Sequence, residues 1–255
     1  MRIARLTTVA VALILTHSAF AQEPTQAEEK SEAQRIYESL NFSAGPDTFD
    51  VTRYASIYLP VDYDRLDAED TRKLMDLYEN PSSVDEYYVG PIDERWFAVF
   101  SYEDSGHIKD DEEIDADALL ASLREGNRMA NRERRDRGWS ELEILGWQYK
   151  PSYSNATQRL SWAVLAESDG TQIVNYNTRL LGRTGVISAV LVAEPETLDA
   201  SVAEFEELLD GFKYNPGNTY AEYKPGDKLA TYGLAALVTG GAAAAIAKGG
   251  GKGLF

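Results

Sequence analysis

The spacing of hydrophobic residues changes near residue 140, so the two halves of the chain predict different structures. In the first half, leucines recur at helical spacing in two segments, and the second follows four carboxylates at residues 110–113, which a helix N-terminus favours. Alternating aromatic and small residues predict one strand, and a segment that ends at Pro60 predicts another. We therefore expect strands at residues 52–59 and 96–102, a helix at residues 66–78, and a second helix that ends at Gly138.

The second half alternates hydrophobic and polar residues with a period of two, which indicates strands. Short turns such as Ser168-Asp169-Gly170 join consecutive segments, so the strands should form an antiparallel meander. A helix at residues 198–209 follows and should cover one face of the sheet. The predicted class is α+β, with an antiparallel meander flanked by helices. Its strands are expected at residues 143–148, 160–167, 172–181 and 186–193.

Both ends of the chain carry apolar segments of their own. Residues 1–21 combine two arginines, a short apolar run and Ala19-Phe20-Ala21, which predicts a signal peptide cleaved after Ala21. Residues 229–247 are uncharged and long enough to span a bilayer as a C-terminal transmembrane helix. On that helix the small residues recur every fourth position, a spacing suited to close helix packing: Ala236, Gly240 and Ala244.

These segments divide the chain into four parts. We expect a signal peptide (1–21), an acidic flexible lead-in (22–50), an exported α+β domain (51–227), and a transmembrane helix with a short basic tail (228–255). This arrangement predicts a protein of the bacterial inner membrane with most of its chain in the periplasm. Its partners would be the membrane and either a membrane protein or a second copy of the chain.

Charge and composition exclude several classes of function. The formal net charge is −17, and residues 22–227 alone hold forty-two acidic and twenty basic side chains, a net −22. Nucleic-acid binding needs a basic surface, so it is excluded. There is no cysteine and only His17 and His107, which leaves no basis for disulfides or a cofactor or metal site of the usual kinds.

Two polar clusters are candidates for chemistry or binding. His107 lies beside the acidic run at residues 110–113, where it could act as a general base or the acids could bind calcium. These acids lack the spacing of a calcium loop, and a solvated loop with helix capping explains them better. Six arginines lie within residues 124–137. They either bind an anion or an acidic partner or pair with acids of the same chain. The arginines expected on one helix face are Arg124, Arg128, Arg132 and Arg135.

Several motifs together resemble the bacterial domain of unknown function 2167 family, whose members are described as predicted membrane-anchored proteins. The resemblance covers most of the chain from about Ala55 onward, and it implies no activity or catalytic residue. The family usually has tyrosine where His107 stands, which weakens the case for a histidine base. The motifs are residues 106–112 and 114–120, Gly146-Trp147, Pro151, Tyr153, Leu160, Trp162-Ala163, Asn175-Tyr176, Arg179, 181–183, Gly185, Gly226-Asp227, Ala230 and 232–234.

The exported part is also similar in outline to the Mog1/PsbP-type sandwich, because a final helix follows the meander. Our leading hypothesis is a non-enzymatic, membrane-anchored periplasmic module with a binding or assembly role. Two alternatives are a cell-envelope hydrolase that uses paired carboxylates, and an anion or small-ligand binder that uses the arginines of residues 124–137.

Overall fold

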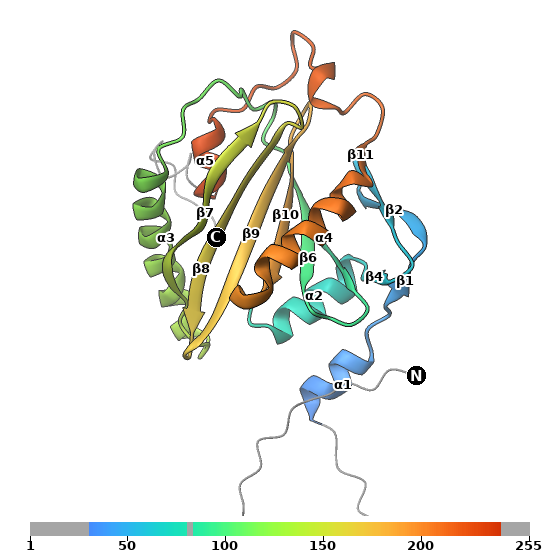
Figure 1. Ribbon diagram of the computed structural model, residues 1–255, viewed down its shortest axis with the longest axis vertical. Coiled ribbons are helices and arrows are strands. Elements are labelled where there is room, and N and C mark those ends of the chain that lie inside the picture. The colour runs from blue at the N-terminus through green and yellow to red at the C-terminus, as the bar shows by residue number, and fades with distance from the viewer. Residues whose placement is uncertain (1–30, 81–83, 241–255) are drawn as a thin grey trace, which may run out of the picture.

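An eight-stranded antiparallel sheet lies at the centre of the molecule (Figure 1). The computed structural model describes residues 31–80 and 84–240. The spatial order of the strands is β1-β4-β5-β6-β10-β9-β8-β7. Their bounds are β1 (Ser43–Ala44), β4 (Tyr63–Arg65), β5 (Glu86–Pro91), β6 (Phe97–Glu103), β7 (Glu143–Ser154), β8 (Arg159–Ser168), β9 (Thr171–Leu181) and β10 (Val186–Ala193).

The four strands from β7 to β10 pair in sequence order, so the predicted meander is confirmed. Asp169 and Gly170 join β8 to β9 with φ angles of 49° and 78°, the conformation that a tight hairpin requires. The outer edge of β10 pairs with β6, which comes from the first half of the chain. The α+β class is therefore correct.

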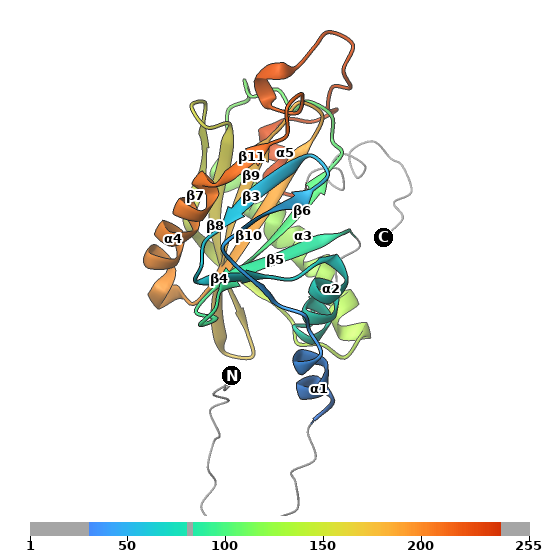
Figure 2. The ribbon, with the colours of Figure 1, turned by 90° about the vertical axis from the view of Figure 1, so that its right-hand side faces the viewer.

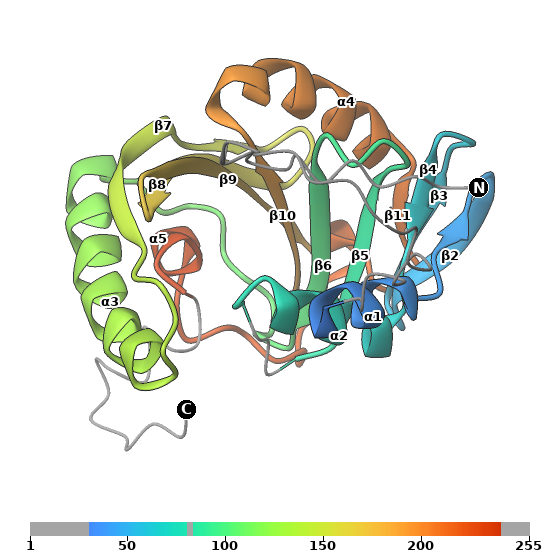
Figure 3. The same cartoon turned by 90° about the horizontal axis from the view of Figure 1, so that it is seen from below.

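One face of the large sheet is covered by a second, smaller sheet and one helix (Figures 2 and 3). The helix is α4 (Leu198–Asp210), preceded by the 3-10 turn η1 (Pro195–Thr197). Its Phe205 is fully buried against Phe100 of β6 and Trp96. The small sheet has the order β11-β3-β2, with bounds β11 (Phe212–Tyr214), β3 (Ala55–Leu59) and β2 (Asp47–Thr52).

The expected single strand at residues 52–59 is wrong, because a turn divides it. Thr52 ends β2, and its hydroxyl accepts a hydrogen bond from the Tyr54 amide at 3.1 Å, which stabilises the turn into β3. The two strands form a hairpin that buries Phe49 and Val51 beside Ile57 in the main core.

The opposite face of the large sheet is covered by helices at its two sides (Figure 3). Towards β5, α1 (Glu32–Glu38) and α2 (Ala68–Leu77) adjoin a cluster formed by Leu40, Leu66, Leu74, Met75, Tyr88 and Val99. Towards β8, α3 (Ala116–Asp136) and α5 (Leu234–Val238) adjoin a second cluster around Trp162. Helix α1, Leu40, strand β1 and the first four residues of β2 fall within the predicted lead-in of residues 22–50, so part of that segment belongs to the fold.

The long helix α3 starts later than its acidic flank indicates. Its N-cap is Asp115, whose carboxylate accepts hydrogen bonds from the amides of Asp117 and Ala118, both at 3.1 Å. The four acids at residues 110–113 precede this cap in an irregular loop. They therefore do not cap α3.

The predicted transmembrane helix at residues 229–247 is wrong over its described part. Only Leu234–Val238 are helical, and Leu234, Leu237 and Val238 are buried in the cluster around Trp162. Residues 229–233 are not helical, and Gly240 follows the helix with a φ of 108°. Residues 241–247 and the predicted signal peptide lie outside the described residues. No helix among residues 31–80 and 84–240 is long and apolar enough to cross a membrane.

Candidate functional site

Two distant segments of the chain meet at one end of the large sheet (Figure 1). The loop of residues 104–115 follows β6, and residues 215–233, which we call the strap, follow β11 and contain the 3-10 turn η2 (Tyr220–Glu222). The His107 amide donates to the Lys228 carbonyl at 2.8 Å, and the Ala230 amide donates back to the His107 carbonyl at 3.0 Å. Most motifs behind the family resemblance lie in or beside this loop cluster.

An ion pair fixes the strap to the turn between β9 and β10. The Arg183 guanidinium donates to both carboxylate oxygens of Asp227, at 2.6 and 2.7 Å, and a further nitrogen donates to the Gly217 carbonyl. These hydrogen bonds lower the pKa of Asp227 to about 2. Arg183 and Asp227 therefore have a structural role in holding the strap.

His107 lies between two tyrosine rings of the strap. Its ring centroid is 4.4 Å from that of Tyr220 and 4.3 Å from that of Tyr223, and all three rings are close to parallel. Its Nδ1 atom has no hydrogen-bond partner within the part of the chain that the structure describes. The geometry therefore packs His107 as an aromatic ring and does not align it with a carboxylate. A tyrosine at this position, as in the resembling family, would suit the same stack.

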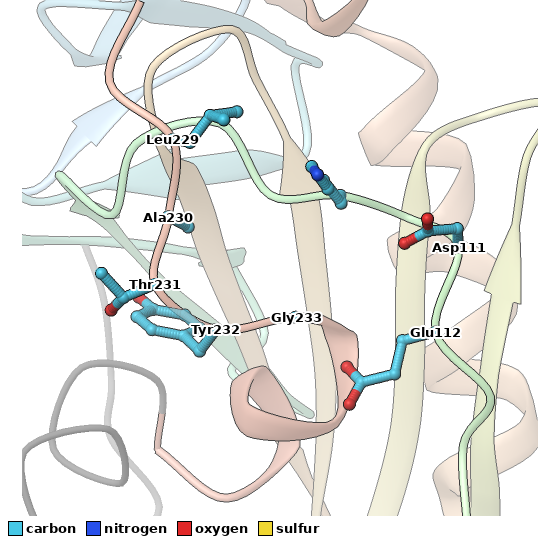
Figure 4. A pocket seen from close by; sticks show the side chains of 8 residues that line it. Asp111, Glu112, Leu229, Ala230, Thr231, Tyr232 and Gly233 are labelled. Carbon is cyan, nitrogen blue, oxygen red and sulfur yellow. The ribbon is translucent and has the colours of Figure 1, made fainter. Parts of the chain in front are cut away.

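A small pocket opens beside the loop cluster (Figure 4). Its volume is about 370 Å³, and it is lined by Lys109, Asp111, Glu112, Leu229, Ala230, Thr231, Tyr232 and Gly233. Glu112 is not free to act on a ligand, because its carboxylate accepts a hydrogen bond from the Ala235 amide at 2.9 Å and so caps α5. A side chain at Gly233 would displace this carboxylate, because a Cβ there would overlap its Oε2 atom.

Most of the predicted arginine cluster is engaged within α3 and its neighbours. The Arg124 guanidinium donates to the backbone carbonyls of Ile144 and Leu145 in β7. Arg128 pairs with Glu125, and Arg135 pairs with Glu141. Arg132 is exposed and contributes to lowering the pKa of Glu125, after the larger effect of Arg128.

These contacts reveal a role for α3 at the free edge of the sheet. β7 is the last strand, so its outer backbone groups have no neighbouring strand. Asn131, which is buried, donates to the Leu142 carbonyl at 2.7 Å and accepts from the Leu142 amide at 3.0 Å, and Asn127 donates to the same carbonyl. Polar side chains of α3 thus satisfy the backbone where the chain enters β7.

A larger pocket, which we call the α3 pocket, lies between this helix and the β7–β8 hairpin. Its volume is about 640 Å³. Glu143 and Glu167 are direct partners across β7 and β8, so two like charges face each other at its wall. The lining has four carboxylates and two arginines, from Arg124, Asn127, Arg128, Asn131, Glu141, Leu142, Glu143, Ile144, Leu145, Glu167 and Asp169.

Acid catalysis by paired carboxylates predicts a carboxyl group whose pKa is raised. Among the described residues, every carboxyl group with a shifted pKa has it lowered instead. Hydrogen bonds lower the pKa of Asp70, mainly from Lys73, and of Glu222, mainly from Thr219. These acids are held ionised by structural partners.

The predicted helix-packing residues do not share one described helix. Ala236 lies in α5, Gly240 lies beyond its end with positive φ, and Ala244 lies outside the described residues. Sequence reasoning did not single out Glu143, Glu167 or Asn131. The turn residues between β7 and β8 are the only sequence signal for the facing glutamates, and three bulges in β7 obscure it.

Fold and site together define an α+β domain in which helices and the strap pack around one large antiparallel sheet. An acidic pocket lies at the edge of that sheet. The chain belongs to the family described as "Protein of unknown function (DUF2167)", whose model matches residues 43–253. No curated protein matches it. Among solved structures, the chain is similar to cyanobacterial PsbP (CyanoP) from Synechocystis sp. PCC 6803, with 11% identity and a TM-score of 0.39, covering 69% of this chain and 93% of that one. A likeness of this size carries no functional information.

Proposed function

We propose that this chain is an exported, non-enzymatic module that binds a positively charged segment of a partner protein through the α3 pocket. The observation that carries the proposal is the pair Glu143 and Glu167, which face each other across β7 and β8 in that pocket. Like charges at directly opposite positions repel and destabilise the strand pair. A lysine or arginine of a partner placed between them would offset one of the two charges and relieve the repulsion.

The basic residues around the pocket support a cationic partner over an anionic one. Arg124 donates to backbone carbonyls, and Arg128 and Arg135 pair with glutamates, so their charges are largely engaged. The net charge of −22 over residues 22–227 would also speed the approach of a basic partner. Export and inner-membrane location stay predictions from the terminal sequences.

The proposal is tested by titrating the mature chain with an oligolysine peptide and following binding by calorimetry. The double variant Glu143→Gln/Glu167→Gln should bind about tenfold more weakly, because each of the two charged contacts is worth about 0.7 kcal/mol in a partly exposed site. The same variant should be slightly more stable when free, since it removes the repulsion.

The matched control is Glu196→Gln/Glu207→Gln, which removes two exposed carboxylates on and next to α4. It changes the net charge equally but leaves the α3 pocket intact. If the control weakens oligolysine binding as much as the pocket variant does, the attraction is a property of the whole acidic surface and the proposed site is wrong.

A further inference from the structure

Five arginines of the described residues are not exposed, and one of them, Arg179 in the middle of the large sheet, lacks an ion pair. Each of the others has a carboxylate oxygen within 4.0 Å; they are Arg65, Arg134, Arg159 and Arg183. Arg179 in β9 has no such partner among residues 31–80 and 84–240. Its one hydrogen bond is long, from Nη1 to the Thr178 carbonyl at 3.5 Å.

The side chains nearest Arg179 are aromatic or uncharged and polar, and Glu103 of β6 attracts its charge from beyond ion-pair distance. Its guanidinium lies over the ring of Trp162, with Cζ 4.9 Å from the ring centroid. Ser188 of β10 is its direct cross-strand neighbour, and Asn177 lies two positions earlier on the same face of β9. These side chains can donate hydrogen bonds to an anion, and Trp162 holds the guanidinium plane in place.

The position of Arg179 on the sheet leaves it reachable. It lies on the same face of the sheet as Trp162 and the cluster around that residue. Trp162 beneath it is buried, with 2% of its surface exposed, whereas Arg179, Asn177 and Ser188 are only half-buried. Burial lowers the pKa of Arg179 to about 10, so the group remains a cation at neutral pH.

A half-buried cation that no carboxylate contacts is unfavourable, since the more distant Glu103 offsets only part of the cost of burial, and a ligand of opposite charge would offset the rest. We propose that Arg179, stacked on Trp162 and flanked by Asn177 and Ser188, is the centre of a binding site for a small ligand with a single anionic group, either a carboxylate or a phosphate. The planar guanidinium can bind either group with two parallel hydrogen bonds. The net charge of −22 over residues 22–227 disfavours polyanions.

This site is independent of the proposed function, because β9 is separated from the edge strand β7 by β8, and Arg179 does not line the α3 pocket. The test is an NMR titration of the mature chain that follows the arginine Nε–Hε signals. Sodium acetate and sodium phosphate are the probes, with sodium chloride at equal ionic strength as the reference. The Arg179 signal should shift saturably, whereas the signals of Arg159 and Arg183 should not. Whichever probe saturates at lower concentration identifies the carboxylate or the phosphate as the preferred group.

Variants separate binding from a structural role. Arg179→Met should abolish the saturable effect of the probe on the melting temperature and leave the free protein at least as stable, because an unpaired charge is removed. Arg179→Lys keeps the charge but loses the planar fork, so its affinity should fall about tenfold. Arg132→Gln, at an exposed position of α3 outside the α3 pocket, should bind like the unmodified chain.

The proposal is overturned if neither probe shifts the Arg179 signal saturably, or if Arg132→Gln weakens binding as much as Arg179→Lys. If Arg179→Met fails to fold, the titration of the unmodified chain and the Arg179→Lys comparison still decide the question. A destabilised Arg179→Met without any probe effect on the unmodified chain would make Arg179 a structural residue.

Discussion

At the scale of single residues, the loop cluster depends on one glycine that no other residue can replace. Gly106 has a φ of 87°, and a Cβ at this position would lie 2.7 Å from the Lys228 carbonyl of the strap. The left-handed φ favours glycine over other residues, and the short distance to the strap leaves no room for a side chain. Gly106 therefore lets the loop and the strap approach within backbone hydrogen-bonding distance.

Replacing Gly106 with alanine should separate these two effects when it is compared with Gly138. Gly138 also has a positive φ, of 74°, but a Cβ there would have no atom within 4 Å. Gly138→Ala should cost about 1 kcal/mol for the left-handed conformation alone. Gly106→Ala should cost about 3 kcal/mol, because the collision with the strap adds to it. Urea unfolding measures both, and equal costs would contradict the crowding at Gly106.

The motifs that resemble the family include Gly106, Arg179 and Asp227, but their partners could not be predicted from the sequence. Counting back from the turn between β7 and β8 would place Gly170 opposite Glu143. Three bulges in β7 shift the register so that Glu167 takes that place. A bulge depends on how a strand bends over its core, and no local pattern in residues 143–154 encodes it.

At the scale of secondary structure, α3 acts as a cover for the sheet edge and not as a free basic surface. Its side chains Arg124, Asn127 and Asn131 donate to the backbone carbonyls of residues 142–145. An uncovered edge strand pairs readily with other chains. Covering it with a polar helix face removes that hazard.

Replacing Asn131 with alanine should destabilise the protein by about 1 to 2 kcal/mol, because the Leu142 amide loses its partner and the Leu142 carbonyl keeps only Asn127. Hydrogen exchange at the Leu142 amide should become faster, and the variant should aggregate more readily on heating. Arg132→Ala, one position along and exposed, is the control and should change stability by less than about 0.5 kcal/mol. Unchanged exchange at Leu142 in Asn131→Ala would show that the edge is protected by other contacts.

The period of hydrophobic residues predicted the long elements well, since every strand from β7 to β10 and helices α2 and α4 form where it indicates. It failed at α5 for a physical reason. A buried helix and a membrane-spanning helix are both apolar on all sides. Composition alone therefore does not show whether such a helix packs against a sheet or against lipid tails. Leu234, Leu237 and Val238 pack on the sheet.

At the scale of the whole molecule, the strap connects the C-terminal part of the fold to both halves of the sheet. Its ion pair to Arg183 makes this connection dependent on pH. Asp227 has its pKa lowered to about 2 from an ordinary value of 3.8, because Arg183 donates to its carboxylate. The resulting stability is fully present above about pH 4 and is lost as the pH falls towards 2.

Comparing the unmodified chain with Asp227→Asn should reveal this dependence. The asparagine variant cannot ionise, so the difference in unfolding free energy between the two proteins should stay constant from neutral pH to about pH 4. It should then shrink steadily towards pH 2. Denaturant unfolding at a series of pH values measures the difference. A difference that is the same at pH 2 and pH 7 would mean that the ion pair does not stabilise the strap.

The burial of Leu234, Leu237 and Val238 against Trp162 also determines when this protein can finish folding. All strands of the large sheet precede residue 194 in the chain, so they are synthesised before the helix that closes the cluster around Trp162. Until that helix arrives, the face of the sheet under it stays uncovered, and such surfaces are prone to aggregation. The cluster around Trp162 is therefore the last part of the core to be completed as the chain is made.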